Sequence, residues 1–217
     1  MSCKRGHKEP KNIHEAAMEG DTAAIEEFLA QGCKLDARIG AGLTPLHIAT
    51  RYGRLEAVEL FLSKGAEVDV LDKQWKTRLH WAAYFGHREV ALILINNGAN
   101  INARVQKGAT PLSLAAAGQE ENEDVITALI AEGADINAAT DQGHSPLHIA
   151  VMFGQPDILK ILLANGADSQ LKDKSGKTPL ERAVILSKTK FRRGTLMSKR
   201  KKELETCVRI LQEHQTK

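Results

Sequence analysis

Short apolar segments with helical spacing recur along the chain, separated by glycines and polar residues. Residues 44–53 hold a few apolar side chains between a Thr-Pro pair and a glycine. A Thr-Pro pair favours a helix start, because the hydroxyl can cap the helix and proline fits its first turn, and a glycine favours a helix end. In residues 54–65, Val58, Phe61 and Leu62 recur at three- and four-residue spacing before a second glycine. The pattern therefore predicts two short helices followed by a polar loop.

This two-helix unit repeats along the chain. Its motif Thr-Pro-Leu-His, or a variant of it, begins at Thr44, Thr77, Thr110, Ser145 and Thr178, in steps of 33, 33, 35 and 33 residues. An earlier copy lacks Thr-Pro but keeps the phase, because His14 lies 33 residues before His47. Neither helix of a unit can bury its apolar face alone, whereas stacked copies can. We therefore expect an array of stacked repeats.

The period and the motifs resemble those of the ankyrin repeat family. The shared features are Thr-Pro-Leu-His, an alanine in the first helix, the glycines that end the helices, paired leucines, and Gly-Ala-Asp, as in residues 133–135. The resemblance implies an all-α solenoid of about six helix-turn-helix repeats with hairpin loops, short inner helices and longer outer helices. It also implies that the protein binds another protein through the concave face of hairpins and inner helices, and that it is not an enzyme.

The motifs also suggest how the chain is divided. The segments are a basic N-terminal extension (1–11), an N-terminal capping repeat (12–39), repeats 2 to 5 (40–72, 73–105, 106–140 and 141–173), and a divergent C-terminal repeat with an insertion and a basic capping helix (174–217). Repeat 4 has two extra residues, which predicts an acidic finger over 118–123. In the last segment Leu204, Cys207, Val208 and Leu211 fall on one helical face, which predicts that this helix closes the stack.

Composition and charge narrow the class of protein. Of the 217 residues 42% are hydrophobic and 26% charged, as in ordinary globular proteins, and no apolar run is long enough to span a bilayer. The three cysteines, Cys3, Cys33 and Cys207, are scattered, which argues against a disulfide framework or zinc site and for a reducing compartment. The net charge is +3, but residues 187–217 alone carry ten Lys or Arg against three Glu. The body is therefore mildly acidic, which does not favour a nucleic-acid-binding domain.

Four histidines at equivalent positions are the first candidates for chemistry: His14, His47, His80 and His148. They lie on successive layers, too far apart to share one metal ion, whose ligands must lie ~2 Å from it. The resemblance implies that this histidine instead bonds to backbone between adjacent loops. No serine or cysteine has a setting suited to a nucleophile. We therefore expect no catalysis, no cofactor and no metal site.

The variable positions of the hairpins and inner helices carry the strongest functional signal. Mapped from the family onto this sequence, the predicted partner-binding residues are Tyr52, Lys73, Trp75, Lys76, Tyr84, Phe85, Lys107, His144, Met152 and Phe153. Aromatic residues and methionine are enriched at interface hot spots, and five of the nine aromatic residues of the chain fall in this set. Trp75 also replaces a glycine that four sister repeats have. We expect a partner segment to anchor on Trp75 and Tyr84.

Two other interpretations of this face stay open. In the first, the two central aromatic residues stack a base while the three lysines of the set hold phosphates, so that the face binds a nucleotide or an oligonucleotide. The acidic body argues against nucleic acid. In the second, residues such as Phe85 and Phe153 pack between repeats, and the solenoid is purely structural.

The C-terminal segment offers further candidates. The cluster Lys199, Arg200, Lys201 and Lys202 is suited to a nuclear address, to a membrane-surface or nucleic-acid contact, or to a solvated helix start. Residues 192–195 resemble a basophilic kinase site at Thr195, and Asn137 ends a motif that asparaginyl hydroxylases accept in ankyrin repeats. We expect a monomer without a transmembrane segment in the cytoplasm. A nuclear location, and delivery into a host cell from a bacterium, are the alternatives.

Overall fold

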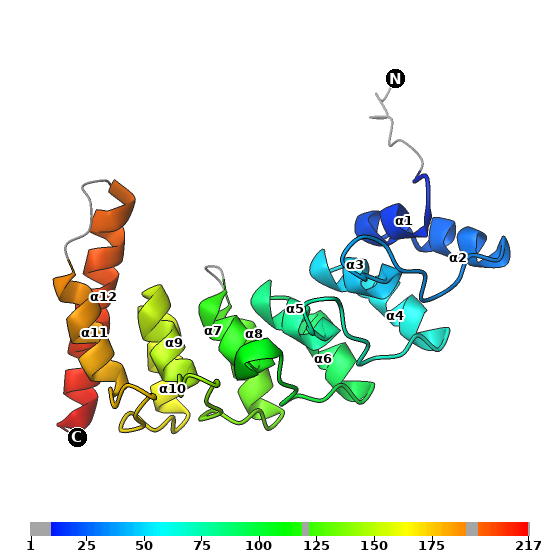
Figure 1. Ribbon diagram of the computed structural model, residues 1–217. Helices are drawn as coiled ribbons and strands as arrows, with labels where there is room; N and C mark the ends of the chain where they lie inside the picture. The colour runs from blue at the N-terminus through cyan, green and yellow to red at the C-terminus, as the bar shows by residue number, and fades with distance from the viewer. Residues whose placement is uncertain (1–9, 119–121, 190–194, 217) are drawn as a thin grey trace.

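The computed structural model describes residues 10–118, 122–189 and 195–216, and within these ranges the chain is all-α (Figure 1). The helices come in consecutive pairs: α1 (Ile13–Glu19) and α2 (Thr22–Ala30), α3 (Pro45–Arg51) and α4 (Leu55–Ser63), α5 (Arg78–Tyr84) and α6 (Arg88–Asn96), α7 (Pro111–Ala117) and α8 (Glu123–Ala131), α9 (Pro146–Phe153) and α10 (Pro156–Ala164), α11 (Pro179–Lys188) and α12 (Thr195–Gln215). A turn of 3₁₀-helix, η1 (Gln106–Gly108), precedes α7. The predicted all-α solenoid is confirmed.

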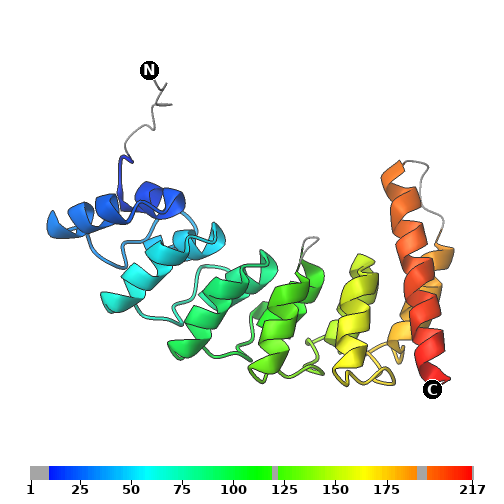
Figure 2. The same cartoon turned by 180° about the vertical axis from the view of Figure 1, so that it is seen from behind.

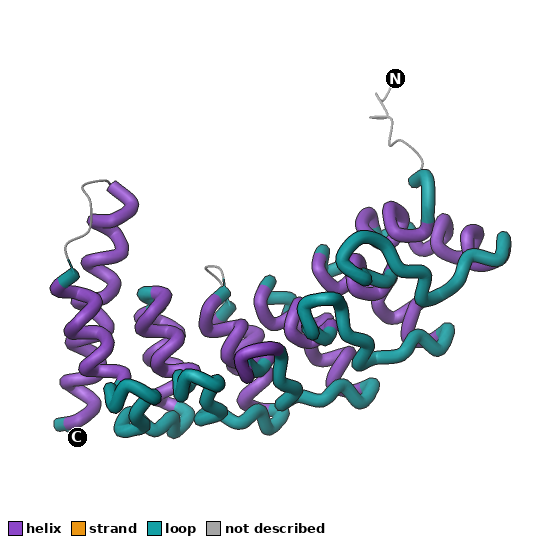
Figure 3. The backbone as a smooth tube through the Cα atoms, in the orientation of Figure 1, coloured by secondary structure: helices purple, strands orange, loops and turns teal. Residues whose placement is uncertain are grey.

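The helices form two layers that run the length of the array. Each odd-numbered helix contacts the next odd-numbered one, and each even-numbered helix contacts the next even-numbered one. Figures 1 and 2 show that the stacked pairs follow an arc, with α1 and α2 at one end and α11 and α12 at the other. The loops that join one pair to the next run along one edge of the arc (Figure 3). We call the odd-numbered helices the inner helices.

The core is shared between neighbouring repeats. Leu46 of α3 and Phe61 of α4 are fully buried, as are the small Ala49 and Ala82 that let inner helices approach each other. At the C-terminal end, the apolar stripe of α12 is buried through Leu204, Cys207 and Leu211, while Val208 is half-buried. Helix α12 packs on α10 and α11 and therefore occupies the last place in the even-numbered layer.

The four equivalent histidines tie each inner helix to the loop of the next repeat. Their Nε2 atoms donate to Ala37 O (His14, 2.8 Å), Val70 O (His47, 3.1 Å), Ala109 O (His80, 3.4 Å) and Lys177 O (His148, 3.0 Å). The Nδ1 of His47 accepts from the N–H of Thr44, which fixes the neutral tautomer. Burial lowers the pKa of His47 to about 3 and that of His80 to about 4. The rings of His47 and His80 are therefore uncharged structural links at neutral pH.

A second series of hydrogen bonds joins the even-numbered layer to the preceding inner helix. A side chain just before an even-numbered helix, or in the second turn of α12, donates to a carbonyl at the end of the inner helix one repeat earlier. The pairs are Arg54 to Met18 O (2.8 Å), His87 to Arg51 O (3.0 Å), Asn122 to Tyr84 O (3.3 Å), Gln155 to Gly118 O (3.2 Å) and Arg200 to Met152 O (2.7 Å). Because helix ends leave carbonyls unsatisfied, these donors both cap a helix and set the spacing of repeats.

The predicted acidic finger lies in part outside the described residues, which omit 119–121. Asn122, at its C-terminal side, is buried and donates to Ala115 O at 2.9 Å as well as to Tyr84 O. In the part of the chain that the structure describes, no helix is long and apolar enough to cross a membrane.

Candidate functional site

The hairpin between α4 and α5 displays Trp75, which at 54% exposure is the most exposed large apolar side chain among the described residues. Its backbone is in the left-handed region, with φ of 63°. The equivalent residues of the other hairpins are Gly42, Gly108, Gly143 and Gly176, with φ between 73° and 81°. This region is unfavourable for a bulky residue. Trp75 therefore costs the fold conformational energy while presenting its ring to solvent.

Asp72 holds this hairpin in place. Its Oδ1 accepts the backbone N–H groups of Gln74 at 2.7 Å and Lys76 at 2.9 Å. Its Oδ2 accepts the indole N–H of Trp81, which lies on α5, at 3.1 Å. Asp72 itself is buried, and these partly buried bonds fix the tip that carries Trp75 relative to the inner helix.

Trp81 lies beneath two cations. Its ring stacks on Phe85 with 5.7 Å between centroids. The guanidinium of Arg51, from the preceding inner helix, is 5.3 Å from the Trp81 centroid and 5.6 Å from that of Phe85. The ammonium of Lys76 is 4.9 Å from the Trp81 centroid. These are cation–π distances, each contact contributing about 0.5–1 kcal/mol near the surface.

Two tyrosines border these rings. Tyr52, which follows α3, is 45% exposed and has the guanidinium of Arg51 at 5.9 Å from its centroid. Tyr84, the last residue of α5, is 37% exposed and meets Phe85 edge-on at 5.1 Å. Phe85 itself is half-buried. We name the aromatic cluster as Arg51, Tyr52, Lys76, Trp81, Tyr84 and Phe85.

A buried cation supports the same hairpin from below. Arg78 takes the place of proline in the Thr-Pro-Leu-His motif and is fully buried. Its Nη1 donates to Glu67 O and Val68 O, and its Nη2 donates to Thr44 Oγ1 at 2.9 Å. Burial lowers its pKa to about 10, so it stays charged at neutral pH. Arg78 therefore ties the stem of the Trp75 hairpin to the start of α3.

Three predicted site residues lie apart from the cluster, in repeat 5. Phe153 is 49% exposed at the end of α9, and Met152 beside it is half-buried. His144 is half-buried with its Nε2 3.8 Å from Asp173 Oδ2; burial lowers its pKa, Arg182 lowers it further, and Asp173 opposes both. Among the described residues, no hydrogen bond, ion pair or ring contact joins these three to the aromatic cluster.

The two remaining lysines of the predicted set are exposed on hairpins. The backbone N–H of Lys73 donates to Ala41 O at 2.8 Å, and Lys107 O accepts from the N–H of Asp141 at 2.9 Å. These bonds join neighbouring hairpins and leave both ammonium groups exposed. Lys107 has φ of 71° and so resembles Trp75 in holding a left-handed conformation without being glycine.

Two residues that the structure brings into this site, Asp72 and Trp81, were outside the predicted positions, whereas Arg51 occupies one of the variable concave-face positions mapped from the family. One signal was available, because Trp81, Tyr84 and Phe85 are spaced i, i+3, i+4 and so share a helix face. Trp81 also stands where sister repeats have Ile48, Leu114 and Ile149. The hydrogen bond to Asp72 and the stacking of Arg51 from another repeat have no such local signal.

The predicted modification sites stay predictions. Asn137 is half-buried, and its Oδ1 accepts the backbone N–H of Asp168 at 2.9 Å. Thr195 begins α12, and its side chain lies outside the described residues.

The basic cluster at the start of α12 contacts its neighbours. Lys199 lies 3.8 Å from Glu203 and Lys201 lies 3.8 Å from Glu205, each one helical turn away. Arg200 donates to Met152 O. Arg200 therefore takes part in docking α12. The two lysine–glutamate pairs, in contrast, are ordinary i, i+4 contacts on a helix surface.

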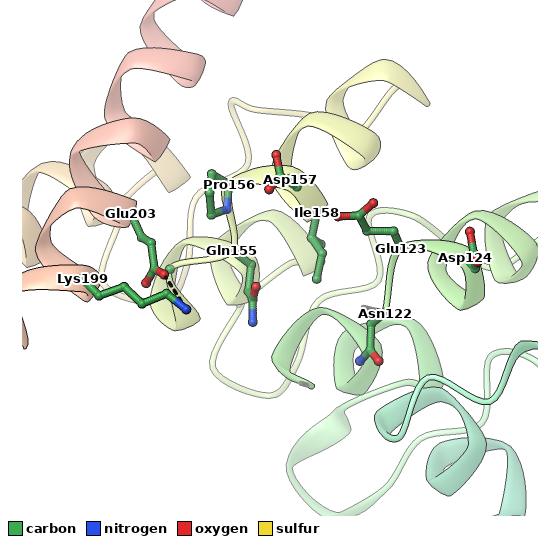
Figure 4. Close-up of a pocket in the computed structure, with 10 residues that line it drawn as sticks. Asn122, Glu123, Asp124, Gln155, Pro156, Asp157, Ile158, Lys199 and Glu203 are labelled. Atoms are coloured by element: carbon green, nitrogen blue, oxygen red, sulfur yellow. Dashed lines mark ion pairs between the residues drawn. The ribbon is translucent and has the colours of Figure 1, made fainter. Parts of the chain in front are cut away.

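A cavity of about 640 Å³ lies elsewhere, between the starts of α8 and α10 and the side of α12 (Figure 4). Its lining includes the carboxylates of Glu123, Asp124, Asp157 and Glu203 together with Lys199. Carboxylates in the first turn of a helix are stabilised by the helix dipole, which accounts for three of them, and Glu203 pairs with Lys199. None of the ten predicted partner-binding residues lines this cavity. In the described part of the chain, no three His, Cys, Asp or Glu side chains are placed to hold a metal ion.

Comparison with known families identifies the class of protein. The family model of ankyrin repeats in three copies matches twice, over residues 13–105 and 112–193. The two matched ranges together cover most of the chain. The chain therefore belongs to the ankyrin repeat family. No curated protein matches it in a sequence comparison.

Proposed function

We propose that this ankyrin array is a non-catalytic interaction module that binds another protein on its hairpin and inner-helix face, anchored at Trp75 and the aromatic cluster. Ankyrin repeats are in general protein–protein interaction modules. A monomer in the cytoplasm is part of the same proposal, supported by the scattered cysteines and by a stack that α12 covers at one end.

The conformation of Trp75 carries this proposal. A glycine would fit the left-handed position without strain, as it does in four sister hairpins. Instead the position holds tryptophan, the largest side chain, which is more than half exposed. Tryptophan at this position destabilises the fold but offers a large apolar surface to a partner. Conformational strain of this kind is characteristic of functional sites. Large aromatic anchors beside arginine are also the typical composition of interface hot spots.

The surroundings of Trp75 favour rigid recognition. Asp72, Arg78 and the hairpin-to-hairpin bond of Lys73 hold the tip before any partner arrives. Tyr52 and Tyr84 are exposed in the aromatic cluster, to which Lys76 of the same hairpin belongs. Little ordering is therefore lost on binding, and preorganisation of this kind improves affinity.

Affinity capture from a lysate of the source cells tests the proposal. The wild-type chain is compared with Trp75→Ala/Tyr84→Ala and with Glu59→Ala, which truncates an exposed residue on the even-numbered helix α4. We expect a protein that binds wild type and the control but is lost from the double variant, since each anchor contributes about 2 kcal/mol, or roughly thirtyfold in affinity.

Circular dichroism confirms that the variants are folded. Recovery of the same proteins by all three baits would refute this face as the binding site. Capture of nucleic acid with a steep dependence on salt would favour the nucleotide or oligonucleotide alternative instead.

A further inference from the structure

The face around Trp75 is entirely cationic where it is exposed. Across the hairpin tips of 39–43, 72–76 and 105–109 and the inner helices α3, α5 and α7, the basic residues are Arg51, Lys73, Lys76, Arg78 and Lys107, and the acidic residue is Asp72. Arg78 and Asp72 are both buried. Four cations therefore lie on this surface, and the exposed Asp141 of the next hairpin borders it beside Lys107.

The two cations nearest the rings have no carboxylate partner. Among the described residues, no ion pair includes Arg51 or Lys76; their contacts are with the rings of the aromatic cluster. Asp72 forms no ion pair with either of them, and its oxygens accept hydrogen bonds from the backbone N–H groups of Gln74 and Lys76 and from the indole of Trp81. A guanidinium that stacks on an aromatic ring can still donate from its edge to a carboxylate. Ring stacking thus holds the side chains of Arg51 and Lys76 in place, with no ion-pair partner among the described residues.

Exposed aromatic rings lie on the same hairpins and inner-helix ends, and Tyr52 has the guanidinium of Arg51 over its ring. Trp75, Tyr84 and Tyr52 offer 54%, 37% and 45% of their surfaces. A ligand that complements both the cations and the exposed rings has a carboxylate next to an apolar side chain. Electrostatic complementarity of this sort sets specificity and speeds association.

We infer that the partner segment is an acidic peptide whose carboxylates lie against Arg51 and Lys76 while an adjacent apolar or aromatic side chain packs on Trp75 and Tyr84. This inference rests on the proposed function and specifies the chemical character of the partner segment. A protein segment fits better than a nucleic acid strand, because backbone phosphates need a long basic track, and the basic residues here are confined to repeats 2 to 4.

Selection from a phage-displayed library of random peptides tests the inference without knowledge of the natural partner. The full chain is used as bait in three forms: wild type, Arg51→Glu/Lys76→Glu, and Lys34→Glu, which alters an exposed lysine in the loop after α2. We expect wild type and Lys34→Glu to enrich peptides in which Asp or Glu neighbours an apolar residue. The charge-reversed bait should lose these peptides and favour Lys or Arg.

Titration of one selected acidic peptide measures how much each cation contributes to binding affinity. We expect Arg51→Glu or Lys76→Glu to weaken binding about tenfold or more, the effect of one charge-assisted bond, with Lys34→Glu unchanged. Wild-type peptides without acidic enrichment, or the same peptides on the charge-reversed bait, would overturn the inference. So would displacement of the peptide by a deoxythymidine oligomer that itself saturates the chain.

The two proposals fail in different ways. Peptides that depend on Trp75 and Tyr84 but carry no acidic residue would support the proposed binding face and contradict the inference that its ligand is acidic. Peptides that bind the Trp75→Ala/Tyr84→Ala variant as well as wild type would reject both.

Discussion

The indole N–H of Trp81 donates to Asp72 at 3.1 Å, and the same relationship returns in the last hairpin, where Arg182 donates to Asp173. Trp81 and Arg182 occupy one position of the repeat, and Asp72 and Asp173 another. The same two positions hold Val105 and Leu114 before and in repeat 4, and the mixed pair Thr140 and Ile149 before and in repeat 5. A polar pair and an apolar pair are therefore both accommodated at this contact.

This contact predicts an energetic coupling that a double-mutant cycle measures. Trp81→Leu and Asp72→Val each leave one partner unmatched, whereas the double variant reproduces the pair of repeat 4. We expect a coupling of about 1–2 kcal/mol in the free energy of unfolding, as for a hydrogen bond to a charged group. Strict additivity in urea denaturation would show that the contact contributes nothing.

Repeat alignment predicted the fold and many exposed residues of the site, since both follow from period and position. Tyr52, Trp75, Tyr84 and Phe153 are all exposed. The cluster itself could not be predicted, because Arg51 reaches it from the neighbouring repeat and side-chain directions across a repeat boundary are not encoded in a local pattern. His144 is in the predicted site set, but it is half-buried because Asp173 of the next hairpin packs on it.

Thr50 offers a stabilising substitution. Its hydroxyl is fully buried without a hydrogen-bond partner, and the equivalent residues of other repeats are apolar, among them Ala83 and Val151. Since an unpaired buried hydroxyl is unfavourable, Thr50→Val should raise the free energy of unfolding by about 1 kcal/mol. Thr50→Ser, which keeps the hydroxyl and loses the methyl group, should lower it. A Thr50→Val protein that melts below wild type would contradict the account.

The buried histidines predict loss of stability in acid. Burial holds the pKa of His47 at about 3 and that of His80 at about 4, whereas an unfolded histidine has a pKa of about 6.5. Below pH 6.5 these histidines bind protons in the unfolded state but not in the folded state. The free energy of unfolding is therefore highest above pH 6.5 and falls as the pH drops toward 4.

Each histidine contributes a slope of up to about 1.4 kcal/mol per pH unit in this window. His80→Ser, which copies Ser113 of repeat 4, should remove one such slope while lowering stability at pH 8. Denaturation curves across the pH range measure it. An unchanged slope in the variant would mean that His80 titrates normally in the folded protein.

The basic cluster predicts unequal roles for adjacent residues. Arg200 donates to Met152 O and so helps to dock α12 on α9, whereas Lys202 is exposed on the same helix. Arg200→Ala should therefore cost about 1 kcal/mol of stability, and Lys202→Ala should leave stability within about 0.5 kcal/mol of wild type. Equal melting temperatures for the two variants would show that the side chain of Arg200 does not stabilise the docking of α12.

One substitution separates folding from binding at the centre of the site. Trp75→Gly restores the residue that the four sister hairpins have at this position. Relief of the left-handed strain should raise the free energy of unfolding by about 0.5–1 kcal/mol, while loss of the ring removes the main anchor.

The most direct measurement is the affinity of Trp75→Gly for the protein that wild type captures, made alongside its melting temperature. The account predicts a chain at least as stable as wild type whose binding is weaker by roughly thirtyfold or more. A stable Trp75→Gly chain that binds with wild-type affinity would contradict it, because the strained, exposed tryptophan would then have no part in recognition.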